Sequence, residues 1–146
     1  MPLFDVPVPR RQLWPIDAPW PRRRARVLLR KFQSCFPEIA YDMDLGVELA
    51  NAQAFLGDGK KRVRLYGGLV RHRKIGSCGL AVALAHETGH HLGGPPYLRH
   101  YRWLSSEERA TEWAMTIGLR EVFGGDRTPL VAKRGIGELR LIGSVE

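Results

Sequence analysis

The segment Leu80–His90 constrains this chain most, because it ends an apolar run with the pattern His-Glu-x-x-His. In a helix, His86 and His90 lie one turn apart on the same face, so both imidazoles can bind one metal ion. Glu87 is rotated by about 100° from His86 and stays clear of that ion. Zinc lowers the pKa of a water molecule beside it, and a neighbouring carboxylate can take the proton. The pattern therefore predicts two zinc ligands and a general base, Glu87.

Apolar side chains surround nearly the whole of this helix, which predicts that it is buried. Burying two imidazoles and a carboxylate costs free energy unless a hydrogen-bond partner or an opposite charge, such as a metal ion, is buried with them. The pattern can arise by chance, and buried histidines with structural roles are common. The predicted burial nevertheless favours a metal site.

A β-hairpin is predicted before this helix. Residues 47–56 carry apolar side chains suited to a strand, Gly57-Asp58-Gly59 form a turn, and Arg62–Tyr66 alternate between polar and apolar. The helix is expected to begin near Ser77 as its N-cap and to end at the glycines and prolines of 93–96. Residues 22–33 are expected to form an amphipathic helix that packs behind it.

A second helix follows at Ser105, where Ser105 and Glu108 have the spacing of a capping box. Ala110, Ala114 and Gly118 are small and share one face with Glu107, which predicts close approach to another helix. The glycines at 124–125 are expected to end this helix.

A catalytic zinc site needs three protein ligands and one open position, so a third ligand must come from elsewhere in the chain. Glu107 is the favoured candidate, because it has no capping role and lies on the small-residue face. His100 is the rival ligand, and Asp126 is a more distant one.

These residues resemble the gluzincin pattern, in which His-Glu-x-x-His is followed downstream by Glu-x-x-Ala-Asp. Segments 51–55, 64–70 and 80–90 also follow in the order found in minigluzincins and HtpX-like zinc peptidases. The resemblance covers about residues 47 to 118, roughly half of the chain. It implies a soluble zinc metallopeptidase whose sheet offers an edge strand to an extended peptide.

The sequence departs from those families at Thr111, where they usually carry an aspartate. That aspartate normally orients a metal ligand and raises its basicity. A threonine hydroxyl can form a hydrogen bond but brings no charge. We therefore expect a functional site that retains its metal less tightly.

The 146 residues predict an α+β fold, in which a short antiparallel sheet packs on the active-site helix and a glutamate-bearing helix follows. Residues 1–21 are expected to form a proline-rich extended arm, with Trp14 and Trp20 as contacts to the body. Residues 22–146 are expected to form one zincin-like domain. Residues 126–146 are weakly patterned, with a short strand predicted at 139–142.

The net charge of +8 could attract an acidic peptide or protein substrate, nucleic acid or an anionic membrane surface. A solvated basic surface explains it equally well, and no recognised nucleic-acid-binding motif accompanies the charge. No stretch is apolar enough for a membrane span, and residues 1–21 lack the apolar core of a signal peptide. A cytoplasmic location is therefore the default expectation, although export by another route leaves no mark in the sequence.

The competing function is non-enzymatic. In that case the chain would be a basic binding module that a structural zinc ion stabilises, with nucleic acid as one candidate partner. Structural sites usually fill the fourth position with a protein ligand, and His100 or Cys78 could supply it. An exchangeable water at the metal would favour the enzyme, whereas four protein ligands would favour the binding module.

Overall fold

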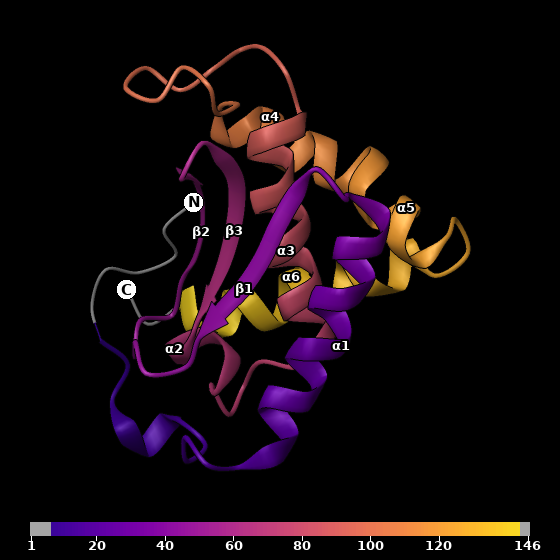
Figure 1. The fold of residues 1–146 in the computed structure, drawn as a ribbon. Coiled ribbons are helices and arrows are strands. Elements are labelled where there is room, and N and C mark those ends of the chain that lie inside the picture. The colour runs from indigo at the N-terminus through magenta and orange to yellow at the C-terminus, as the bar shows by residue number, and fades with distance from the viewer. Residues whose placement is uncertain (1–6, 144–146) are drawn as a thin grey trace.

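The computed structural model describes residues 7–143 and has an α+β architecture, which confirms the predicted fold class. A three-stranded sheet forms one layer, helix α3 runs behind it, and α6 packs on α3 from the side away from the sheet (Figure 1). Helix α1 packs against both α3 and strand β1. The metal-ligand pattern therefore lies in the central helix of the fold.

The elements, in chain order, are η1 (Arg10–Gln12), α1 (Pro19–Cys35), β1 (Ile39–Asp44), β2 (Ala52–Gly57), β3 (Lys60–Tyr66), α2 (Gly67–Val70), α3 (Ser77–Leu92), α4 (Glu107–Trp113), the π-helical turn η2 (Ala114–Gly118), α5 (Leu119–Phe123) and α6 (Thr128–Gly143).

The predicted hairpin is present as β2 and β3, which pair antiparallel. Asp58 and Gly59 join them with φ angles of 53° and 74°, the left-handed conformations that a two-residue hairpin turn requires. The sheet is not antiparallel throughout, because β1 pairs parallel with the other side of β3. The strand order β1-β3-β2 leaves β2 at an edge of the sheet.

The N-terminus of α3 is held by a side chain from the other end of the sequence. Ser77 is the first helical residue and Gly76 is the N-cap, so the predicted capping role of Ser77 is wrong. A carboxylate oxygen of Glu138, from α6, accepts hydrogen bonds of 2.8 Å from the backbone N–H groups of Gly76 and Gly79. This acceptor satisfies helix N–H groups that would otherwise lack a partner.

The start of α4 differs from the prediction by one residue. Ser106 is the N-cap, and its hydroxyl accepts a hydrogen bond from the Arg109 N–H. Ser105 is fully buried, and its hydroxyl donates to the Gly94 carbonyl instead. The predicted capping box of Ser105 with Glu108 is therefore wrong, because the chain uses the Ser105 side chain to close the loop after α3.

The C-terminal segment forms α6, so the predicted short strand at residues 139–142 is wrong. Glycines within the segment weaken its helical pattern, yet one of them is needed for packing. A Cβ atom on Gly135 would lie 2.4 Å from the Cys78 carbonyl oxygen of α3. Contact with α3 therefore outweighs the low intrinsic helix propensity of this segment.

The described part of the predicted proline-rich arm is attached to the body. Isolated bridges pair Pro7 with Leu49 and Leu13 with His72, and the Trp14 ring packs edge-on against Trp20. Helix α1 begins at Pro19 rather than at Arg22, because proline fits the first turn of a helix. Residues 1–6 of the arm lie outside the described residues. From residue 7 to residue 143, no helix has the length and apolarity needed to cross a membrane.

Candidate metal centre

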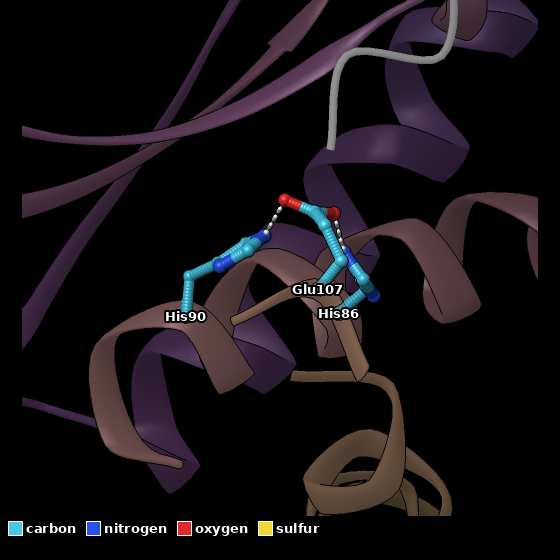
Figure 2. Close-up of side chains that lie close together, drawn as sticks. All are labelled: His86, His90 and Glu107. Atoms are coloured by element: carbon cyan, nitrogen blue, oxygen red, sulfur yellow. Dashed lines mark hydrogen bonds and ion pairs between the residues drawn. The ribbon is translucent and has the colours of Figure 1, made fainter. Parts of the chain in front are cut away.

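The structure brings His86, His90 and Glu107 together (Figure 2). His86 Nε2 lies 3.0 Å from one carboxylate oxygen of Glu107, and His90 Nε2 lies 3.2 Å from the other. We searched residues 7–143 for three or more His, Cys, Asp or Glu side chains placed to hold one metal ion, and these three residues are the group found. Their ligand atoms all lie within 4.8 Å of one another.

Close contact between two helices places Glu107 over the histidines. A Cβ atom on Gly89 would lie 2.5 Å from the Ala110 carbonyl oxygen, so only glycine allows α4 to lie this close to α3. The Ser105 N–H also donates to the His90 carbonyl at 2.7 Å, which fixes the entry to α4. Ala110, on the small-residue face predicted from the sequence, therefore has its expected role.

A hydrogen bond determines which nitrogen of His90 can bind a metal. His90 Nδ1 lies 2.6 Å from the Ser105 carbonyl oxygen, which can only accept, so Nδ1 carries a hydrogen and donates it. In a neutral imidazole, Nε2 then carries the lone pair and faces a carboxylate oxygen. Two acceptors at this distance require a proton or a cation between them. The ligand atoms of His90 and Glu107 are thus arranged to fit a metal ion, and the Ser105 carbonyl orients the His90 ring.

Thr111 contacts the other histidine. Its hydroxyl oxygen lies 3.0 Å from His86 Nδ1, the nitrogen that faces away from Glu107. The sequence predicted that Thr111 would support a ligand, and the structure places it where it can do so. The hydroxyl orients the ring without adding negative charge.

We expect Thr111→Asp to tighten zinc binding by about ten-fold, because a carboxylate beside His86 Nδ1 would raise the basicity of Nε2. Competition with a chromogenic chelator measures this affinity. Thr116→Asp is the matched control, because it places the same charge on an exposed residue further along the same continuous stretch of helix. Unchanged or weaker zinc binding in Thr111→Asp would show that Thr111 does not act in this way.

Burial acts oppositely on the two carboxylates of the site. Glu87 is only 2% exposed, and burial raises the pKa of its carboxyl. Burial alone would also raise the pKa of Glu107, but hydrogen bonds from Nε2–H groups of the His86 and His90 imidazoles, with the proton in the place of a cation, lower it below its usual range. Glu107 is therefore held ionised, as a metal ligand must be, whereas Glu87 has a greater affinity for a proton than an exposed carboxylate.

A cleft of about 530 Å³ opens onto this group. Glu87, His90 and Glu107 lie along it, Leu49 and residues 51–56 form one wall, and the loop after α3 forms the other. The loop contributes Leu98, Tyr101, Trp103 and Leu104 to the lining. The sequence predicted that His100 of this loop could reach the metal, but it gave no sign that Leu98, Trp103 and Leu104 would line the cleft.

The alternative ligands do not join the group. Of the described residues that could hold a metal together, none is His100, Asp126 or Cys78. Cys78 lies at the opposite end of α3 from the histidines. The sequence also offers Tyr97, His100, Tyr101 and Arg109 as side chains that could stabilise an oxyanion, without favouring one of them. The guanidinium of Arg109 donates to the Gly93 carbonyl and to Glu112, whereas Tyr101 lines the cleft.

Comparison of the chain with protein-family models, with curated proteins and with solved structures finds no match. The resemblance to gluzincins therefore stays a prediction from the sequence. Support for a function comes from the geometry of the site alone.

Proposed function

We propose that this chain is a zinc-dependent metallopeptidase. The observation that carries the proposal is the convergence of His86, His90 and Glu107 beside a cleft that His90, Glu107 and Glu87 line. Two imidazoles and one carboxylate are the ligands of a common class of catalytic zinc site, which keeps its fourth position open. Among the described residues, no fourth side chain joins this group, which favours the enzyme over a structural zinc site.

In the proposed reaction, Glu87 is the general base and then the general acid. A zinc ion held by the three ligands would polarise the peptide carbonyl and lower the pKa of water. Glu87 accepts a proton from the attacking water while the water oxygen forms a bond to the carbonyl carbon. The carbon–nitrogen bond then breaks, and Glu87 returns the proton to the leaving nitrogen. The products are a carboxylic acid and an amine.

The edge strand offers a way to position a peptide substrate. Among the described strands, β2 pairs with β3 alone, and Ala52 to Leu56 line the cleft. An extended peptide could add to this edge through backbone hydrogen bonds and so lie across the metal ligands. Such pairing would bind many sequences, because backbone groups carry no side-chain information.

Zinc content and peptidase activity of the purified protein test the proposal. We expect one zinc ion per chain, loss of peptide hydrolysis on removal of the metal by a chelator, and recovery when zinc is added back. Glu107→Ala should lose zinc and activity together. His100→Ala is the control, and it should keep both. A protein that binds no zinc, or that hydrolyses peptides equally well without it, would refute the proposal.

A further inference from the structure

The loop between α3 and α4 has a composition that the metal site does not explain. Residues 97–103 read Tyr-Leu-Arg-His-Tyr-Arg-Trp, so aromatic and basic side chains are interleaved. Tyr101 is 55% exposed and Trp103 is 49% exposed, although large apolar side chains are usually covered. Their rings pack edge-to-face with centroids 5.6 Å apart. The two rings therefore form an exposed apolar surface beside the cleft.

The opposite wall of the cleft also presents an exposed apolar side chain. Leu56, near the end of β2, is 46% exposed and lines the same cleft as Tyr101 and Trp103. The cleft is thus bounded on both sides by apolar surface that is still in contact with water. A bulky apolar side chain between these walls would remove that surface from water, which is favourable.

Positive charge lies on the two segments that border this end of the cleft. Arg99 and Arg102 are exposed in the loop, and Lys60 and Lys61 are exposed where β3 leaves the hairpin turn. The hairpin turn and the loop lie at the same end of the molecule (Figure 1). Within residues 7–143, none of these four side chains forms an ion pair. Arg62 and Arg64, by contrast, pair with Asp58 and Asp42.

We propose that the substrate is an extended acidic peptide segment that carries a bulky apolar residue. The apolar side chain lies between Leu56 and the rings of Tyr101 and Trp103, and the acidic residues lie beside the four basic residues. This inference rests on the proposed peptidase function and specifies its substrate class. Charges at the rim of a binding site guide association and select partners more than they add affinity. The basic rim would therefore set specificity that pairing with β2 alone does not provide.

Binding to zinc-loaded Glu87→Gln protein tests this inference without requiring hydrolysis. The probes are three short fluorescein-labelled peptides: one with phenylalanine among glutamates, one with phenylalanine among lysines, and one with serine among glutamates. Fluorescence anisotropy should show that the phenylalanine–glutamate peptide binds at least about ten-fold more tightly than either of the others. Its advantage over the lysine peptide should shrink as the salt concentration rises from about 50 to about 500 mM.

Variants of the loop separate the preference for acidic residues from the preference for an apolar residue. Arg99→Glu/Arg102→Glu should remove or reverse the preference for glutamate over lysine. The control Arg23→Glu/Arg30→Glu makes the same charge change on exposed residues of α1, away from the loop (Figure 1), and should keep it. Tyr101→Ser/Trp103→Ser should remove the preference for phenylalanine over serine. The control Leu130→Ser, at an exposed residue of α6, should not.

The outcomes distinguish this inference from the proposed function. Equal binding of all three peptides, or the same preference in the loop variants as in their parent, overturns the substrate class. If the expected preference is found but the zinc-loaded wild-type protein hydrolyses none of these peptides, the binding inference stands and the peptidase proposal fails. If wild-type protein hydrolyses peptides without regard to their charge, the peptidase proposal stands and the proposed substrate class is overturned.

Discussion

Replacement of Glu87 by glutamine is expected to lower kcat/KM for peptide hydrolysis by about 1000-fold while zinc content stays the same. Glutamine has the shape of glutamate, but its amide cannot accept the proton of the attacking water. Glu87 lines the cleft beside His90 and is not among the three residues grouped as metal ligands. The loss should therefore fall on the chemical step, with the metal retained.

Zinc stoichiometry and kinetics must be measured on the same preparation. Glu108→Gln is the matched control, because Glu108 is exposed on α4 and does not line the cleft. This variant should keep full activity. If Glu87→Gln keeps both its zinc and its activity, Glu87 is not the general base. Loss of zinc in Glu87→Gln would instead assign Glu87 a role in holding the site together.

The part of the site that the sequence predicted follows from local periodicity. The spacing of His86 and His90 places both on one face of α3, and the small residues after Glu107 indicate a helix that packs closely. These inferences need only helical geometry and side-chain size. For the same reason, the hairpin could be predicted from the alternation of polar and apolar residues and from one glycine-rich turn.

The features that were missed depend on contacts between distant parts of the chain. Strand β1 pairs parallel with β3, and Asp42 on β1 forms a two-point ion pair with Arg64 on β3. Nothing in the sequence around Asp42 or Arg64 identifies the other residue as its partner. Helix α6 forms against α3 despite its glycines, and the carbonyl that orients His90 belongs to Ser105. A backbone carbonyl is present at every residue, so no residue type could have revealed it.

Gly89 is the position at which the fold and the metal site depend on the same contact. It lies between His86 and His90 on α3, and its Cα faces the backbone of Ala110 on α4. An added Cβ would lie 2.5 Å from the Ala110 carbonyl oxygen and 3.0 Å from its Cα. Backbone atoms cannot move aside as the end of a side chain can. To relieve the clash, α4 would have to shift away from α3 and carry Glu107 with it.

We therefore expect Gly89→Ala to lower the free energy of unfolding by about 2 kcal/mol, because the overpacking exceeds the roughly 1 kcal/mol that alanine gains over glycine in a helix. Zinc affinity should fall by roughly ten-fold as Glu107 moves. Gly137→Ala is the matched control on α6, where an added Cβ meets nothing within 4 Å. That variant should gain about 0.5–1 kcal/mol in stability and keep its zinc affinity. Urea unfolding of the metal-free proteins separates the two effects, because destabilisation without zinc must come from the helix contact. If Gly89→Ala matched Gly137→Ala in both measurements, close packing of α4 on α3 would not be what holds Glu107 over the histidines.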